Sequence, residues 1–175
     1  MIAANSQNAT DTALLIVRVA LGLTLAAHGY FKFFKGGKIA GTARWFDGMG
    51  MRPGKVHAVL AATTELGAGT LFAVGLLTPL AAAGFIGLMI VAAYTQYRDN
   101  GFFSANDGWE YNFVLGLVPI TIATIGPGRF SLDRVLKIDD DLSGWIALLL
   151  FGGIGIAAGI AQLLVFYRPP APDAS

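Results

Sequence analysis

The chain has 175 residues, of which 55% are hydrophobic and 13% are charged, and its net charge is +1. With a mean hydropathy of +0.62, it is too apolar for a soluble domain and typical of a protein that crosses a membrane several times. The near-neutral charge gives no basis for nucleic-acid binding. The sequence contains no Cys, which excludes disulfides, thiolate metal sites and Cys-ligated iron–sulfur clusters.

A polar N-terminal segment, residues 1–12, precedes the first apolar run. It contains no Lys or Arg, unlike the basic start of a secretory signal peptide. We expect Asp11 or Thr12 to cap the first transmembrane helix, which covers about residues 13–33.

One stripe of this first helix carries polar and small residues. At about 100° per residue, the stripe contains Arg18, Gly22, Leu25, Gly29 and Lys32, with His28 at its edge. We expect it to face protein, because Gly22 and Gly29 would let a second helix approach closely.

The longest hydrophilic insertion separates the first span from the second. Within it, Ile39, Ala43, Phe46 and Met49 recur at helical spacing opposite basic residues. This pattern predicts a surface helix over about residues 39–50, with Trp45 near the lipid headgroups. A solvated basic loop is the alternative.

The second and third spans cover about residues 56–77 and 80–97, separated by Thr78-Pro79. Glu65 lies nine residues into the second span, about 13 Å along a helix and close to the centre of a bilayer core of about 30 Å. Because an unpaired charge at that depth is strongly disfavoured, we expect Glu65 to be either protonated or partnered. Arg18, His28 and Lys32 are the candidates.

The fourth span, about residues 110–126, lies between two distinctive segments. Asn100-Gly101-Phe102-Phe103 precedes it, Glu110-Tyr111-Asn112 opens it, and Gly126-Pro127-Gly128-Arg129-Phe130-Ser131-Leu132-Asp133 follows it. Pro119 within the span is expected to kink the helix and to leave a cavity beside Glu65.

These segments resemble the signature of the DoxX family, whose members commonly read NGFF, EY and GPGRYSLD in this order. Phe130 replaces the usual Tyr, and Tyr97 stands where many relatives carry His. The resemblance covers residues 13–133 and implies an all-α, four-helix transmembrane bundle. Its structural motif residues are Gly101, Phe102, Gly126, Pro127, Gly128, Arg129 and Asp133.

A connector, residues 134–143, leads to a fifth apolar segment over about residues 144–167 and a tail, residues 168–175. Gly155 and Gly159 form a GxxxG pair in this added helix. Such a face packs either within the protein or against a partner.

Basic residues are more frequent on the side that holds the first loop, Arg98 and Arg168. This distribution predicts a multi-pass protein with its N-terminus outside and its C-terminus in the cytoplasm. The resemblance places it in the bacterial inner (plasma) membrane.

The resemblance also implies a function. DoxX relatives include a small subunit of quinone-linked oxidase complexes and proteins tied to oxidant detoxification. They carry an Arg and a His-Gly element in the first helix and a Glu in the second. By this analogy, Arg18, His28, Glu65, Glu110 and Tyr111 are candidates for quinone binding or proton relay, with a noncovalent quinone as cofactor and other membrane or redox proteins as partners.

Two alternatives remain open. The protein could be a non-catalytic accessory or assembly subunit, in which the buried polar cluster is purely structural. It could also be a small-solute transporter, although no inverted repeat is evident. A haem between His28 and His57 is not expected, because nothing else marks a haem pocket. The sequence has no P-loop, dinucleotide fingerprint, metal-ligand spacing or other stand-alone catalytic motif.

Overall fold

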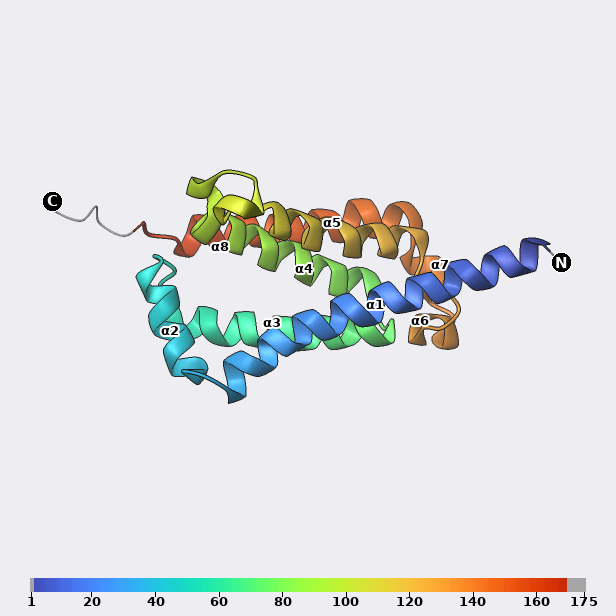
Figure 1. Cartoon of the computed structure of the whole chain (residues 1–175), viewed down its shortest axis with the longest axis horizontal. Coiled ribbons are helices and arrows are strands. Elements are labelled where there is room, and N and C mark those ends of the chain that lie inside the picture. Colours follow the sequence, from blue (N-terminus) through green and yellow to red (C-terminus); the bar gives the residue numbers. More distant parts are fainter. Residues whose placement is uncertain (1, 170–175) are drawn as a thin grey trace, which may run out of the picture.

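The computed structural model describes residues 2–169, which form an all-α bundle with no β-strand (Figure 1). The predicted fold class is therefore confirmed. Within residues 2–169, four helical segments are long and apolar enough to cross a membrane: Asn5–Phe34, Gly54–Val74, Thr78–Asn100 and Ile146–Phe166. A fifth apolar helix, Glu110–Ile125, is shorter; its 16 residues reach about 24 Å at 1.5 Å per residue.

The helices follow one another through short connections. Their bounds are α1 (Ile2–Phe34), α2 (Lys38–Gly48), α3 (Gly54–Val74), α4 (Thr78–Ala92), α5 (Glu110–Ile125), α6 (Leu132–Leu136), α7 (Asp139–Leu142) and α8 (Gly152–Phe166). A π-helical turn, Ala93–Tyr97, and a 3₁₀ turn, Arg98–Asn100, extend α4. Another π-helical segment, Ile146–Phe151, leads into α8.

The start of α1 differs from the prediction. The helix begins at Ile2, so Asp11 and Thr12 lie inside it and do not cap it. The buried Asp11 carboxylate instead accepts a hydrogen bond from the backbone N–H of Arg129, at 3.1 Å. Arg129 also donates to the side chain of Asn8, at 2.8 Å. These contacts hold the polar first turns of α1, whose N-terminal end projects beyond the bundle in Figure 1.

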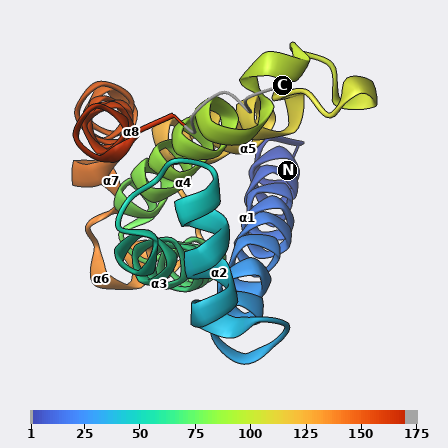
Figure 2. The same cartoon turned by 90° about the vertical axis from the view of Figure 1, so that its left-hand side faces the viewer.

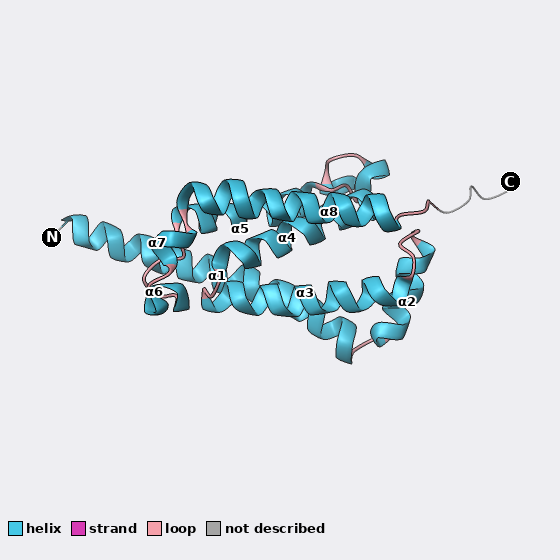
Figure 3. Ribbon diagram, turned by 180° about the vertical axis from the view of Figure 1, so that it is seen from behind, coloured by secondary structure: helices cyan, strands magenta, loops and turns pink. Residues whose placement is uncertain are grey.

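The helices pack in the order α1, α3, α4, with α5 and α8 both against α4. Figure 2 shows α1 and α8 on opposite flanks, with α3 and α4 between them. One end of the bundle, the α2 end, holds α2, the loop after α4 and the C-terminal end of α8 (Figure 3). The other, the α6 end, holds the N-terminal end of α1, the α3–α4 turn, α6 and α7.

Close packing of α1 on α3 confirms the expectation for the glycine stripe. A Cβ at Gly22 would lie 2.5 Å from the carbonyl oxygen of Gly69, and one at Gly29 would lie 2.5 Å from the backbone nitrogen of Leu66. Only hydrogen fits at either position, so the two backbones touch directly.

The fifth helix uses its GxxxG pair within the protein. A Cβ at Gly155 would lie 2.7 Å from the carbonyl oxygen of Ala83, and one at Gly159 would lie 3.1 Å from that of Gly87. The small faces of α8 and α4 therefore pack against each other, which resolves the alternatives left open by the sequence in favour of internal packing.

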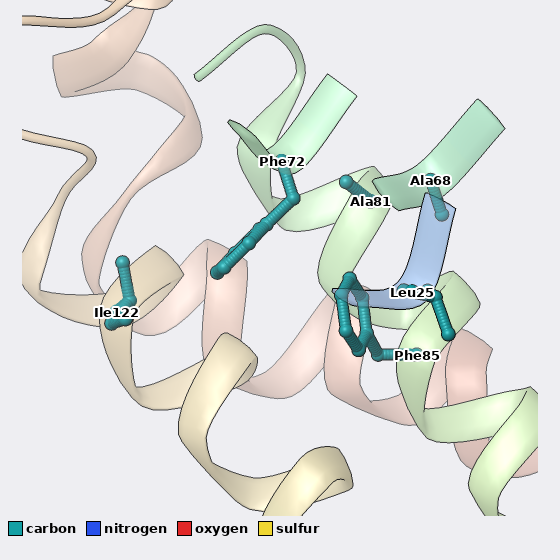
Figure 4. Close-up of a cluster of buried hydrophobic side chains, with 6 residues drawn as sticks. All are labelled: Leu25, Ala68, Phe72, Ala81, Phe85 and Ile122. Atoms are coloured by element: carbon teal, nitrogen blue, oxygen red, sulfur yellow. The ribbon is translucent and has the colours of Figure 1, made fainter. Parts of the chain in front are cut away.

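Apolar side chains fill the centre of the bundle (Figure 4). The rings of Phe72 and Phe85 lie 5.2 Å apart, and both side chains are fully buried. This core cluster also contains Leu25, Ala68, Ala81 and Ile122. It joins α1, α3, α4 and α5, so all four predicted core spans share one interior.

A helix, α2, occupies most of the segment for which a surface helix was expected. Phe46 of α2 is buried, and Ile39, Ala43 and Met49 pack beside it against α3. Trp45, whose ring packs against that of Phe46, is 46% exposed. The helix α2 therefore covers the α2 end of the bundle with its apolar face inward.

Candidate functional site

Glu65 is paired with Lys32 inside the bundle. The Lys32 ammonium donates to both carboxylate oxygens, each at 2.7 Å. The side chains of Lys32 and Glu65 are 17% and 11% exposed, respectively. Gly29, one turn before Lys32, packs on the backbone of α3 beside Glu65, and this close approach of the helices brings the two charges together. Of the three partners considered, Lys32 is the one that binds Glu65.

The ion pair lies at the wall of a cavity of about 540 Å³. The cavity runs between α3, α4 and α8, and Trp45, Phe46 and Met49 line it at the α2 end. A volume of this size is within the range of small-molecule binding sites. Pro119 does not line it; this residue is buried within α5.

Five hydroxyl and amide side chains share the cavity with the ion pair and were not among the sequence candidates. They are Thr63 and Thr64 on α3, Thr95 and Gln96 in the π-helical turn after α4, and Gln162 on α8. Intramembrane amides and hydroxyls are a recognisable sequence signal. However, their convergence depends on the packing of α8 against α4, which the sequence does not specify.

His28 lies one helical turn before Lys32 on α1. Its side chain is exposed on the outer side of α1 and does not line the cavity. His28 is therefore a neighbour of the ion pair that points away from the bundle interior.

Arg18 lies elsewhere, at the α6 end. Its fully buried guanidinium donates from Nη2 to the carbonyl oxygen of Phe130, at 2.6 Å. Its Nη1 packs directly over Gly75, where a Cβ would overlap it. Within residues 2–169, Nε and Nη1 of Arg18 have no hydrogen-bond partner. Arg18 thus belongs to the contact between α1 and the segment after α5.

Asp133 completes this contact. Its buried carboxylate accepts hydrogen bonds from the backbone N–H of Leu77, at 2.7 Å, and from the backbone N–H and hydroxyl of Thr78, at 3.0 and 2.7 Å. Its own N–H donates to the carbonyl oxygen of Gly75, at 2.8 Å. Asp133 therefore caps the N-terminus of α4 from 55 residues away in the sequence.

The remaining residues of the GPGR segment shape the same end. Gly126 and Gly128 both have positive φ, of 108° and 81°, which glycine adopts without strain. Nearby, Arg134 donates to Asp139 at 2.9 Å, and this hydrogen bond together with the charge of Asp139 raises the pKa of Arg134. The segment therefore has a structural role, because it holds neighbouring helices together at the α6 end.

Glu110 and Tyr111 lie at the α2 end, away from the ion pair. Glu110 accepts a hydrogen bond from the backbone N–H of Ser104, at 3.0 Å, and Tyr111 is 52% exposed. Gly101 and Phe102 are hydrogen-bonded to the start of α5. Their carbonyl oxygens accept hydrogen bonds from the backbone N–H groups of Trp109 and Glu110, respectively. These residues shape the loop after α4 and do not line the cavity.

His57 is a buried residue of α3 that faces α8. Its Nδ1 lies 2.9 Å from the side-chain nitrogen of Gln162, and its ring packs edge-on against Phe166. The strand-like contact between Met51 and Tyr167 lies at the same end. His57 thus helps to attach α8 to the rest of the bundle.

Comparison with known proteins agrees with this architecture. Residues 13–98 match the DoxX family model. The chain is 29% identical over 136 residues to an uncharacterized membrane protein, Rv3486, of Mycobacterium tuberculosis (strain ATCC 25618 / H37Rv), an alignment that covers 71% of this chain and 81% of that protein. No solved structure matches the chain. The family match contains the ion pair and ends before the NGFF and GPGRFSLD motifs. Through residues 13–98, the chain belongs to the DoxX family of membrane proteins.

Proposed function

We propose that this protein is the membrane subunit of a quinone-linked redox or oxidant-detoxification system, and that the cavity beside Lys32 and Glu65 takes the quinone headgroup. The observation that carries the proposal is a buried ion pair at the wall of a cavity of about 540 Å³ within the membrane-spanning bundle. An ionisable pair inside a membrane is costly and favours a functional role.

The residues that line the cavity fit such a headgroup. A quinone carbonyl accepts hydrogen bonds, and Lys32, Thr64 and Gln96 line the cavity from three helical segments and carry donor groups. The Glu65 carboxylate, held beside the Lys32 ammonium, can accept one proton and release it to a group in the cavity. The apolar residues around them suit an isoprenoid tail. A bound quinone would supply the redox chemistry, with electrons provided by another protein.

The experiment is mass spectrometry of the tagged protein, isolated from native membranes in a mild detergent. We expect the wild type to carry stoichiometric quinone and the double variant Lys32→Met/Glu65→Leu to carry none. Replacing both partners avoids leaving one buried charge unpaired. Glu110→Gln is the matched control, because it neutralises a carboxylate outside the cavity, and it should retain quinone. Quinone at background level in the wild type, or full retention in the double variant, would refute the proposal.

A second candidate, an accessory or assembly subunit, is favoured by the exposure of His28. An imidazole on the lipid side of a membrane helix is unfavourable unless it faces another protein. Thr24, one turn earlier, is exposed on the same side. In the same isolation, copurifying proteins that are lost from Thr24→Val/His28→Leu, without any bound quinone in the wild type, would establish this function in place of the first.

A further inference from the structure

A second groove of about 500 Å³ lies between α4 and α5 on the outer surface of the bundle, with Ile156 of α8 at one side. It is separate from the cavity beside Glu65 and shares only Met89 with it. Its inner end is formed by Ile86 and Ile120, and its mouth by Arg98 and Trp109. From residue 86 to residue 98 the helix rises about 18 Å, slightly more than half the thickness of a bilayer core.

One polar side chain faces this apolar groove without an adequate partner. Asn112 is only 7% exposed, and it lines the groove. Among the described residues, its side chain makes one hydrogen bond, from Nδ2 to the thioether sulfur of Met89, at 3.6 Å. A thioether is a weak acceptor, so the Asn112 amide keeps most of its hydrogen-bonding capacity for another group. Burying an amide with so few hydrogen bonds destabilises the protein unless a ligand supplies the missing ones.

Both signs of charge occur at the mouth, where Arg98 lines the groove and Asp99, which does not line it, follows in the sequence. The Arg98 guanidinium lies 4.3 Å from the ring centre of Tyr94, which holds it at the end of α4. Asp99 is next to it, with Oδ1 at 3.3 Å from Nε of Arg98 and with its side chain 85% exposed. A headgroup with a phosphate and an ammonium matches this pair, whereas a purely anionic headgroup would meet the Asp99 carboxylate as well.

We propose that the groove between α4 and α5 binds a zwitterionic phospholipid at the α2 end of the bundle. One acyl chain lies along the groove toward Ile86, an ester carbonyl accepts a hydrogen bond from Asn112, and the phosphate contacts Arg98. The headgroup ammonium lies toward Asp99. The aromatic rings of Tyr94 and Trp109 flank the level of the headgroup, as aromatic residues do at membrane interfaces.

The site is tested by native mass spectrometry of the full chain in detergent, titrated separately with phosphatidylethanolamine and phosphatidylglycerol. We expect one phosphatidylethanolamine to be retained in preference to phosphatidylglycerol. Arg98→Gln should lower its occupancy about tenfold, the effect of losing one charge-assisted hydrogen bond. Arg44→Gln, which removes an exposed cation of α2, should have no effect.

Two further variants address the groove itself. Gly116→Leu should abolish retention by filling the groove, since a Cβ there would meet only the Met89 side chain, at 3.8 Å. Its control is Gly153→Leu on α8, where a Cβ would meet nothing within 4 Å. Asn112→Leu should raise the melting temperature of the lipid-free protein and remove the further rise that phosphatidylethanolamine gives the wild type.

The proposal is overturned if the wild type retains phosphatidylglycerol as well as phosphatidylethanolamine at equal concentration. Unchanged retention in Arg98→Gln would also overturn it, and this surface variant remains informative even where Gly116→Leu does not fold. Failure of the lipid site leaves the quinone proposal untouched, because the two cavities are tested by different variants and different ligands.

Discussion

Asp133 caps the helix that begins at Thr78, although 55 residues separate the two in sequence. The Asp133 carboxylate accepts hydrogen bonds from both the backbone N–H and the hydroxyl of Thr78, and it is completely buried. This one side chain joins the segment after α5 to the turn between α3 and α4. The final residue of the GPGRFSLD motif, Asp133, therefore acts as a helix cap.

We therefore predict that Asp133→Asn destabilises the protein by about 1–3 kcal/mol, because the amide cannot accept all the hydrogen bonds that the carboxylate accepts. The same change removes a negative charge near the buried guanidinium of Arg18. Thermal unfolding in detergent measures the effect. Asp140→Asn, at a side chain that is 92% exposed, is the control and should leave the melting temperature unchanged. Equal melting temperatures for both variants would contradict the capping role.

The helical period predicted part of this arrangement. The stripe that contains Gly22 and Gly29 faces α3, as expected, because small residues at a spacing of seven recur on one side of a helix. The pairing of α8 with α4 was not predictable, since any small face can pack against any other. The cap by Asp133 depends on a contact between distant segments, which no local pattern reveals.

The sequence also could not identify which basic residue of α1 pairs with Glu65. Arg18 and Lys32 lie on one stripe of α1, but 14 residues separate them, or about 21 Å along the helix axis. Only one of the two could therefore reach Glu65. The choice depends on the register of α1 against α3, which the backbone contact at Gly29 sets. The sequence identified the stripe but not the register.

The contact between α1 and α3 can be tested with two glycines of α3. A Cβ at Gly69 would lie 2.5 Å from the backbone nitrogen of Ala26, whereas a Cβ at Gly67 would meet nothing within 4 Å. We expect Gly69→Ala to destabilise the protein by about 1–3 kcal/mol through overpacking. Gly67→Ala should be neutral or stabilise it by up to about 1 kcal/mol, because alanine favours the helix. A Gly69→Ala protein that melts at or above the temperature of Gly67→Ala would show that the helices do not pack in this way.

The ion pair makes a prediction about stability that is independent of any ligand. Glu65→Gln leaves the Lys32 ammonium buried without its counter-charge, which costs about 3–5 kcal/mol for a buried pair. The double variant Lys32→Met/Glu65→Leu removes both charges and should recover most of this loss. A cycle of the two single variants and the double variant, measured by thermal unfolding in detergent, gives the coupling energy. Additive single effects would mean that the two side chains do not form the pair.

The orientation in the membrane remains a prediction, and the natural absence of Cys makes it directly testable. The structure places α2 and α7 at opposite ends of the bundle (Figures 1 and 3), with Arg44 and Asp140 both exposed. Because basic residues are concentrated at the α2 end, that end should be cytoplasmic. In intact cells, a membrane-impermeant maleimide should therefore label Asp140→Cys but not Arg44→Cys.

Permeabilised cells provide the control for this experiment, since both single-Cys proteins should then react. The opposite labelling pattern would invert the orientation while preserving the fold, because the two positions would still lie on different sides. Labelling of both proteins in intact cells would be a more serious contradiction. It would place the two ends of the bundle on one side of the membrane, which helices packed as α1, α3 and α4 are here cannot do while spanning it.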